Sequence, residues 1–429
     1  MNVPSAAGRQ KLYLLLALLL SGNILLFYAL PAKIFITIFL FLAITYFFIG
    51  GSNALLVTSA LVASTIFVEA ALQITPLGDS LYYRPHERFA IKDKDLKHGR
   101  YKANVDYEGL MPHGDLRALA VHTNVESEPR EVVFQTDSWG FRNYEDYNGQ
   151  PYVLVGDSFI VGNGTTQGET LAEQLRSRYA IDVYNLAHPG SVRDYAKYIR
   201  TFRKRLSDEP GVILFLFEGN DFPTPNAPQT KTAPTQRHWP SRVPGGWRLV
   251  AAGKWYLAPF KTTTTYKFAY SLISRVTRVE ERVDVFPVRD ITVAFLRPYV
   301  AVSKRKTLPA NISTEKLLQE MRDVLVHMFF IPTKYRVYCK HIAVCSEDGA
   351  ARLPNSQWLY LREVGERLGI ATTDLTPALV RESDRLLEAD DGVLTFWRDD
   401  THWNKHGIAV AAAQVAKMLE QNSSRMYPE

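Results

Sequence analysis

The chain has 429 residues, of which 46% are apolar, 12% aromatic and 22% charged. This composition excludes a disordered chain, a collagen-like chain and a small disulfide-stapled fold. The net charge of +6 is a small surplus, and its main cluster, Lys304-Arg305-Lys306, has no aromatic residues between the basic ones. We therefore expect no nucleic-acid partner.

Residues 1–75 are almost uncharged and contain three apolar runs, at 12–30, 34–49 and 54–68. A helix that crosses a membrane needs roughly 17–25 apolar residues, so the first run is long enough and the other two are marginal. We predict that residues 1–75 form a membrane anchor with about three transmembrane helices. An anchor with two helices remains the alternative, and it would return the rest of the chain to the cytoplasm.

The basic residues near these runs bear on orientation. Arg9 and Lys11 precede the first run, which favours an N-terminus in the cytoplasm. Three spans then put the rest of the chain beyond the inner (cytoplasmic) membrane, facing the periplasm or the cell exterior. Arg84, Arg88 and Lys92 follow the third run and favour the opposite orientation. We prefer the outward-facing arrangement because the charge rule is weak for large folded domains.

The sequence offers little for a metal or a cofactor. Its two cysteines, Cys339 and Cys345, are too few for a cysteine-ligated zinc or iron–sulfur site, although their short separation permits a local disulfide. His402 and His406 have the i,i+4 spacing of helical metal ligands, but no glutamate occupies the position that zinc peptidases require. We predict no metal and no cofactor, and we leave the disulfide open.

Beyond the anchor, the pattern of apolar residues changes twice. Residues 76–145 contain short alternating stretches such as 131–136, which predict a small strand-rich linker subdomain. In residues 146–420, short apolar runs alternate with helical stretches, which indicates an α/β domain with a mainly parallel sheet covered on both faces. The predicted strands lie at 152–155, 181–186, 212–217, 324–331 and 372–375, and the predicted helices lie at 170–179, 192–206 and 356–368, from residue 314, and after Gly407.

Residues 222–312 interrupt this alternation. They are rich in Pro, Thr, Lys and Arg, and they include Trp239, Trp247 and Trp255. We predict an insertion here, whose tryptophans either stack on sugar rings or pack within a lid.

Chemically useful groups follow successive strands of the predicted sheet. Ser158 comes after the strand at 152–155, Gly190 after the next strand and Asn220 after the third, while His402 precedes the last helix. In open α/β sheets, ligands bind at the carboxyl ends of the strands. Each motif alone is weak, but together they place a hydroxyl, a backbone N–H, an amide and an imidazole near one point.

With these motifs in this order, the chain resembles the SGNH-hydrolase superfamily, also called GDSL. It is most similar to a branch with an Asp-x-His-Trp ending, which includes alginate O-acetyltransferase-like proteins. The segments Gly140-Phe141-Arg142 and Ile331-Pro332-Thr333-Lys334 also resemble that branch, and the resemblance spans about residues 130–415. It implies that the soluble part is a three-layer α/β/α domain.

The resemblance also implies roles for the four motif residues. Ser158 would be the catalytic nucleophile and His402 its base, and the oxyanion hole would consist of the N–H groups of Ser158 and Gly190 with the Asn220 amide. One departure concerns the third motif, where Glu218 stands in place of a glycine found in many members. We expect this change to affect the shape of the loop more than the amide donor.

Two aspartates compete for the role of the catalytic acid. The Asp-x-x-His spacing that is common in the superfamily selects Asp399, and a helical turn would bring that carboxylate onto the same face as His402. The Asp-x-His-Trp spacing of the branch selects Asp400, and in a tight loop a separation of two residues suffices. We favour Asp400 because Thr401-His402-Trp403 follows the branch pattern, and we leave Asp399 open.

These residues predict an acyl-serine mechanism, because a serine hydroxyl needs an adjacent base to act as a nucleophile. The resemblance implies an esterase or O-acyltransferase that deacylates or O-acetylates an envelope glycan. Its partners would be an acylated or acceptor polysaccharide, the membrane and, for transfer, an acyl-exporting membrane protein. Two alternatives stay open: a lipid or thioester hydrolase, and a non-catalytic glycan-binding scaffold subunit of an export complex.

Overall fold

The computed structural model describes residues 51–74, 84–91, 100–120, 122–206, 210–222, 281–308, 312–347, 353–389 and 392–426. The chain divides into two compact units, Met1–Leu81 with Pro228–Thr277, and Tyr82–Ala227 with Arg278–Glu429. The predicted spans at 12–30 and 34–49 lie outside the described residues, as do the three tryptophans of the predicted insertion.

In the first unit, the structure describes the helix α3 (Gly51–Ile74), which contains the third predicted span at 54–68. Among the described residues, no helix combines the length and the apolar character that crossing a membrane requires. The prediction of a third span therefore finds no support in the structure. Polar residues, including Thr58, Ser59 and Glu69, interrupt the apolar sequence of α3.

The second unit is built on a five-stranded sheet in which every neighbouring pair of strands is parallel. The spatial order is β11-β10-β7-β5-β6. This confirms the predicted α/β class and the mainly parallel sheet. The strands are β5 (Tyr152–Val155), β6 (Val183–Asn185), β7 (Gly211–Phe217), β10 (Leu325–Ile331) and β11 (Ala371–Asp374).

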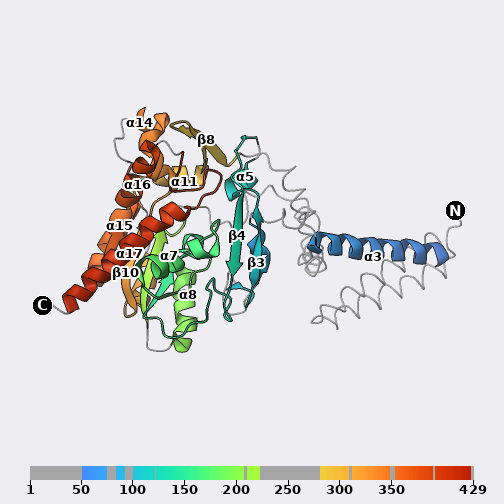
Figure 1. The fold of residues 1–429 in the computed structure, drawn as a ribbon, viewed down its shortest axis with the longest axis horizontal. Coiled ribbons are helices and arrows are strands. Elements are labelled where there is room, and N and C mark those ends of the chain that lie inside the picture. Colours follow the sequence, from blue (N-terminus) through green and yellow to red (C-terminus); the bar gives the residue numbers. More distant parts are fainter. Residues whose placement is uncertain are drawn as a thin grey trace, which may run out of the picture. The chain divides into compact units, whose positions relative to one another are not determined.

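Helices cover both faces of this sheet (Figure 1). Side chains alternate along each strand, so Phe215 of β7 joins one apolar cluster while Leu214 and Leu216 join another. The first cluster includes residues of α7 (Leu171–Tyr179), α16 (Thr376–Glu388) and α17 (Lys405–Met426). The second includes residues of α8 (Val192–Phe202), α12 (Ile312–Met321) and α15 (Ser356–Leu368). The unit therefore has three layers.

The predicted elements agree with the structure within a few residues, and those at 152–155 and 356–368 coincide with β5 and α15. The sequence analysis did not predict α16. It also did not predict the β8–β9 hairpin (Val283–Val288 and Ile291–Leu296), nor α11 (Arg297–Ser303), which belong to the predicted insertion.

From Tyr82 onward, the segment predicted as a linker subdomain belongs to the same compact unit as the parallel sheet. Met111 and Phe134 of this segment lie in one apolar cluster with Phe159, next to Ser158. The segment thus packs directly behind the first catalytic candidate. Its described elements are η1 (Pro85–Phe89), β1 (Ala90–Ile91), β2 (Arg100–Tyr101), β3 (Asp106–Met111), α5 (Asp115–Leu119) and β4 (Arg130–Gln135).

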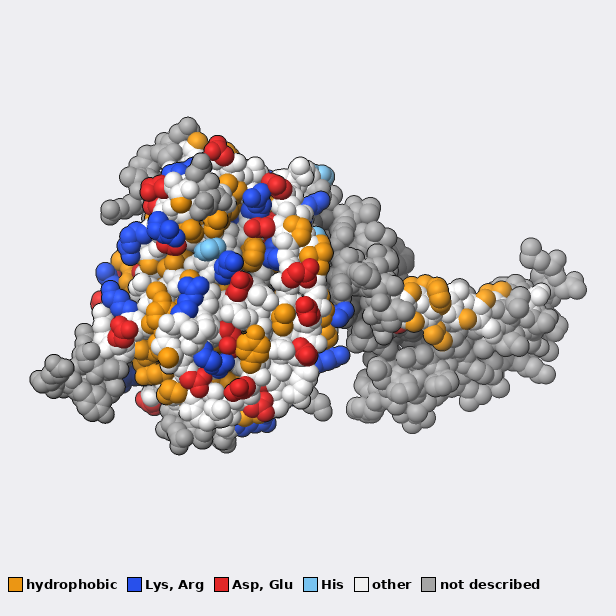
Figure 2. Space-filling model, in the orientation of Figure 1, with side chains coloured by type: hydrophobic (Ala, Val, Ile, Leu, Met, Phe, Trp, Pro, Cys, Tyr) orange, Lys and Arg blue, Asp and Glu red, His pale blue; other side chains and the backbone are white. Residues whose placement is uncertain are grey.

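A disulfide joins Cys339 and Cys345, which answers the question that the sequence left open. It connects the turn after α13 (Lys334–Tyr338) with α14 (Ala343–Glu347). Figure 2 shows acidic and basic side chains interspersed over the visible face of the second unit, in keeping with the small net charge.

Close packing of α15 on the sheet depends on Gly365, and we expect Gly365→Ala to destabilise the protein. An added β-carbon would lie 2.5 Å from the Thr372 Cγ2 of β11 and 2.8 Å from the Ile370 carbonyl oxygen. Overpacking of this kind costs about 1–3 kcal/mol, which exceeds the gain of about 1 kcal/mol in helix propensity. Urea unfolding followed by tryptophan fluorescence measures the change. The matched control is Glu363→Ala, at an exposed position of the same helix, and equal unfolding midpoints for the two variants would contradict the prediction.

Candidate active site

Ser158 is the first residue of α6 (Ser158–Val161), shortly after the strand β5. The Asp157 carboxylate caps this short helix by accepting a hydrogen bond of 2.9 Å from the Phe159 N–H. The order of the strands reverses at β5, since β6 lies on one side of it and β7 on the other. Ser158 is therefore at a topological switch point, where open α/β sheets bind their ligands.

The His402 ring links Ser158 to a carboxylate. Its Nε2 lies 2.7 Å from the Ser158 Oγ, and its Nδ1 lies 2.7 Å from the Asp400 Oδ1. Both distances suit a nucleophile paired with a general base and an orienting acid. His402 is 5% exposed and Asp400 is fully buried, so water competes little for these bonds. This arrangement is suited to taking the proton from the serine hydroxyl.

The structure places Asp400, rather than Asp399, on the imidazole. The His402 N–H also donates to the Asp400 Oδ1, at 3.0 Å, so the two residues form a tight turn. The last helix begins only at Lys405, and the helical argument for Asp399 therefore does not apply. Asp399 instead accepts hydrogen bonds from the Gly114 and Glu128 N–H groups, at 2.7 Å and 2.9 Å. It fastens these two loops to the catalytic turn.

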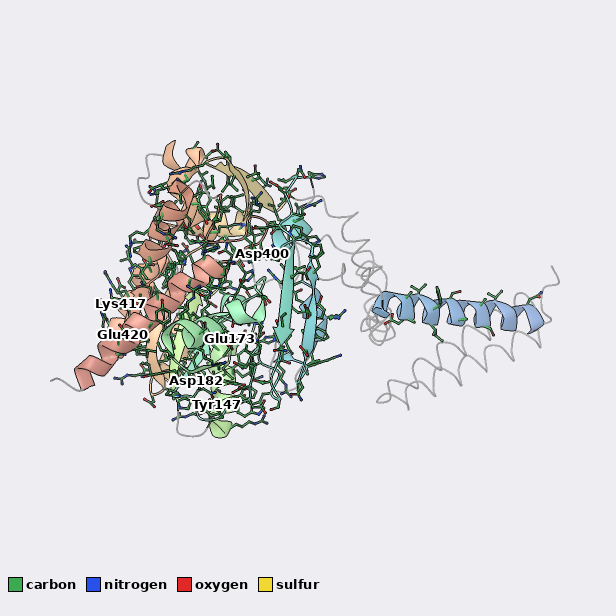
Figure 3. All side chains as sticks on the ribbon, viewed as in Figure 1. Tyr147, Glu173, Asp182, Asp400, Lys417 and Glu420 are labelled. Atoms are coloured by element: carbon green, nitrogen blue, oxygen red, sulfur yellow. A yellow bond between two sulfur atoms is a disulfide. The ribbon has the colours of Figure 1, made fainter. Side chains whose placement is uncertain are left out.

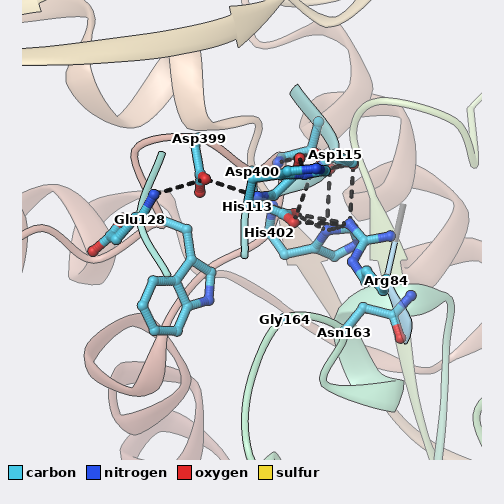
Figure 4. Close-up of polar contacts among 12 residues, drawn as sticks. Arg84, His113, Asp115, Glu128, Asn163, Gly164, Asp399, Asp400 and His402 are labelled. Atoms are coloured by element: carbon cyan, nitrogen blue, oxygen red, sulfur yellow. Dashed lines mark hydrogen bonds and ion pairs between the residues drawn. The ribbon is translucent and has the colours of Figure 1, made fainter. Parts of the chain in front are cut away.

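Two arginines that the sequence analysis did not identify hold Asp400, and Figure 4 shows the first of them, Arg84. The Arg84 Nη2 donates to both Asp400 oxygens, at 2.9 Å and 3.1 Å, and the Arg130 Nη2 donates to its Oδ2 at 3.3 Å. Burial alone would raise the pKa of Asp400, but Arg84, His402 and Arg130 together hold that pKa well below its usual range. Asp400 is therefore ionised throughout the neutral pH range.

No local signal marked Arg84 in the sequence, because 316 positions separate it from Asp400. It lies immediately before η1, and the sequence analysis used Arg84 itself only as evidence about membrane orientation. Figure 3 shows Asp400 beside the ribbons of β4 and α5, which are supplied by the same N-terminal part of the unit.

Asp115 of α5 completes the charged cluster. Its carboxylate accepts hydrogen bonds from the Thr401 N–H and Oγ1, at 2.8 Å and 2.7 Å. Ligand-type atoms of Asp115, Asp400 and His402 lie within 4.8 Å of one another, a spacing compatible with a metal ion. The Arg84 Nη2, however, lies 3.0 Å from Asp115 and 2.9 Å from both other residues. Arg84 supplies the positive charge that this cluster needs, so we assign no metal to it.

The predicted oxyanion-hole loops approach the nucleophile from two sides. The Asn220 amide donates to the Asp157 Oδ2 at 3.4 Å, which brings the residue after β7 next to the Ser158 turn. On the other side, the His188 N–H donates to the Gly156 carbonyl at 3.3 Å, and Gly190 follows two residues later. A β-carbon at Gly190 would lie 2.9 Å from the Asp194 Cβ, so a side chain has little room there.

Other buried groups fix the shape of the catalytic turn. The Lys334 ammonium donates to the carbonyl oxygens of Trp397 and Asp400, at 3.0 Å and 2.8 Å, and burial lowers its pKa to about 8. Glu218, the departure from the family pattern, accepts a hydrogen bond of 2.9 Å from the Thr333 N–H and pairs with Arg336. Its side chain thus ties the end of β7 to the end of β10 and leaves the Asn220 amide free to face Asp157.

Burial also changes the pKa of Asp157, the residue before Ser158. It raises the pKa of Asp157, and the hydrogen bonds from Phe159 and Asn220 oppose that increase. Asp221 lies close behind and accepts hydrogen bonds from the Tyr195 hydroxyl and the Phe217 N–H, at 3.0 Å and 2.8 Å. Burial and the neighbouring Asp157 raise the pKa of Asp221 well above its usual range. Asp157 and Asp221 thus hold the backbone at the start of α6 and at the end of β7.

Residues 304–428 match the family model for the SGNH hydrolase-like domain of the acetyltransferase AlgX. The resemblance to the SGNH-hydrolase superfamily is thereby confirmed for this part of the chain. The matched range contains Asp400 and His402, whereas Ser158 precedes it, so the hydrogen bonds of His402 connect the nucleophile to the matched part. No curated protein matches the chain.

Substitution of Asp400 and substitution of Asp399 should affect the reaction of Ser158 with a fluorophosphonate differently. We expect Asp400→Asn to slow labelling roughly 10⁴-fold, because an amide at this position favours the wrong imidazole tautomer. The matched variant Asp399→Asn should label almost as fast as the wild type, since Asp399 contacts Arg130 and two backbone N–H groups rather than His402. Labelling rates measured by intact-protein mass spectrometry decide between them. Slower labelling of Asp399→Asn than of Asp400→Asn would reverse the assignment of the acid.

Proposed function

We propose that the protein is a membrane-anchored serine esterase or O-acyltransferase that forms an acyl-serine intermediate and deacylates or O-acetylates an envelope glycan. The observation that carries the proposal is the continuous hydrogen-bonded series Ser158–His402–Asp400, with 2.7 Å at each step, at the switch point of the sheet. The match to an acetyltransferase domain supports the esterase or acyltransferase class and an acetyl group as the acyl group.

The chemistry follows from the positions of these groups. The Ser158 Oγ attacks the carbonyl carbon of the donor ester, and its proton passes to the His402 Nε2. The negative charge that develops on the carbonyl oxygen is met by the N–H groups of Ser158 and Gly190 and by the Asn220 amide. As the ester C–O bond breaks, His402 returns the proton to the departing alkoxide. The ionised Asp400 stabilises the imidazolium that exists between these two transfers.

The second half of the reaction repeats these steps with another nucleophile. Water or a sugar hydroxyl gives its proton to His402 and attacks the acyl-serine, and the serine hydroxyl recovers the proton as it leaves. Water yields the free acid, and a sugar yields a new ester. Hydrolysis and transfer therefore use the same residues and differ in the group that reaches the acyl-enzyme.

Localisation is part of the same proposal. The apolar runs at 12–30 and 34–49 support anchoring in the inner membrane. Two spans would put the catalytic unit on the same side as the N-terminus, so the outward placement rests on the disulfide. The disulfide between Cys339 and Cys345 supports an oxidising compartment, and hence a catalytic unit facing the periplasm or the cell exterior. Activated acyl donors are made inside the cell, so transfer would require an acyl-exporting membrane protein as a partner.

The first experiment offers p-nitrophenyl acetate to the full chain, with and without an acceptor oligosaccharide. We expect the protein to gain the mass of one acetyl group, and the oligosaccharide to become acetylated if transfer is the reaction. Ser158→Ala should abolish both changes, because it removes the attacking oxygen. The matched control is Ser138→Ala, at an exposed serine of the same unit. Full activity in Ser158→Ala contradicts the proposed nucleophile. A wild-type protein that neither acquires an acetyl group nor hydrolyses the ester contradicts the proposal and favours a scaffold role.

The second experiment concerns the oxyanion hole. We expect Asn220→Ala to lower kcat for the same ester by about 10²–10³ with little change in KM, because the amide acts on charge that exists only in the transition state. Asn220 is exposed, so its truncation should leave the fold intact. Asn148→Ala, at another exposed asparagine, serves as the control. A loss limited to KM would show that Asn220 binds the substrate rather than the oxyanion.

A further inference from the structure

Arg84 has an unusual position for a buried cation. Its side chain is 5% exposed, and its Nη2 lies within hydrogen-bonding distance of three groups of the site. These are the Asp400 carboxylate, the Asp115 carboxylate at 3.0 Å and the His402 Nδ1 at 2.9 Å (Figure 4). Its Nη1 is engaged separately, in an ion pair of 3.0 Å with Glu87.

The contact between Arg84 and the His402 Nδ1 conflicts with general-base catalysis. A histidine that deprotonates Ser158 must carry its own proton on Nδ1 and donate it to Asp400. A guanidinium has no acceptor, so Arg84 can only donate to Nδ1. If it does so, the ring proton lies on Nε2, and the serine has no base. Arg84 and Asp400 therefore demand opposite tautomers of His402.

Asp115 resolves this conflict. The Thr401 hydroxyl donates to the Asp115 Oδ2 at 2.7 Å, and its oxygen lies 3.1 Å from the His402 Nδ1. Because its own proton goes to Asp115, this hydroxyl can only accept a hydrogen bond from Nδ1. The Asp115 carboxylate also forms an ion pair of 3.0 Å with the Arg84 Nη2. Nδ1 therefore keeps its proton, which Asp400 and Thr401 accept.

We infer that Arg84 and Asp115 are a pair of positioning residues that set the tautomer and the proton affinity of His402. The inference rests on the proposed function and names the residues that tune the same site. Arg84 places a positive charge at the ring and opposes formation of the imidazolium, while Asp115 places a negative charge beside it and favours the imidazolium. Neither residue touches the substrate in this scheme.

Other charged groups surround His402 as well, and the test must separate them from the pair. They come from every element packed against the ring, and they are Asp400 on its own turn, Glu87 on η1, Arg130 on β4, Asp157 before α6 and Lys334 on α13. Arg84 differs from the other cations in reaching the ring itself, at 2.9 Å.

The test is a double-mutant cycle on the pH dependence of kcat/KM for p-nitrophenyl acetate, with the wild type, Arg84→Met, Asp115→Asn and the double variant. Removing the cation should move the acidic limb of the profile to higher pH by about 1–2 units. Removing the carboxylate should move it to lower pH by about 1 unit. The double variant should return to within about half a unit of the wild type, because it removes one charge of each sign.

Separate control variants distinguish an effect on folding from an effect on charge. The double variant leaves neither partner of the pair as an unpaired buried charge, so it remains informative if Arg84→Met fails to fold. Arg84→Lys keeps the charge and should keep the position of the limb. The matched control cycle is Arg176→Met with Asp182→Asn, an ion pair of 3.1 Å that is more exposed and should not move the limb.

The outcomes distinguish a failure of the inference about Arg84 and Asp115 from a failure of the proposed function. If the variants fold and lose activity while the acidic limb stays in place, the pair is structural only and the inference is overturned. A double variant displaced as far as Arg84→Met overturns it too, since the carboxylate then has no opposing effect. If the wild-type Ser158 reacts with no fluorophosphonate and hydrolyses no ester at any pH, the proposed function itself fails.

Discussion

The whole site depends on keeping the negative charge of Asp400 inside the protein. A buried carboxylate costs several kcal/mol unless cations and hydrogen-bond donors surround it. Asp400 is fully buried. Its partners are Arg84, Arg130, the backbone N–H groups of Asp115 and His402, and the Nδ1 of the His402 ring. The charge is stable there because these groups are fixed in place before any substrate arrives, which is also the condition for electrostatic catalysis.

This requirement explains why the segment before the parallel sheet belongs to the same unit. Arg84, Asp115 and Arg130 come from η1, α5 and β4, and none of these elements belongs to the sheet that carries Ser158. Asp399 reinforces the arrangement, because it accepts the Gly114 and Glu128 N–H groups next to two of these residues. The two adjacent aspartates thus have different roles. Asp400 binds the imidazole, and Asp399 holds the loops that precede Asp115 and Arg130.

The sequence predicted those features of the fold and the site that depend on short stretches of the chain. The apolar runs predicted the parallel sheet, and the strand-end motifs predicted Ser158 and His402, which the structure joins at 2.7 Å. It did not predict Arg84 or Arg130, because a basic residue has no local signature of burial and the chain has 50 of them. The preference for Asp400 rested on the branch pattern at Thr401-His402-Trp403. Asp399 stayed open because local sequence does not decide whether residues 399–402 form a helix or a turn. The hairpin β8–β9 was missed although its strands are largely apolar, because residues 222–312 were treated as one insertion.

The position of Arg84 in the chain connects the chemistry to the architecture. It comes three residues after Leu81, where the first compact unit ends and the second begins. The cation that balances Asp400 therefore comes from the first residues of the second compact unit. A catalytic unit cut after this stretch would retain Ser158, His402 and Asp400, but Arg130 would be left as the cation on the buried carboxylate, and at 3.3 Å it makes the longer contact. The first residues of the second compact unit are thus part of the active site.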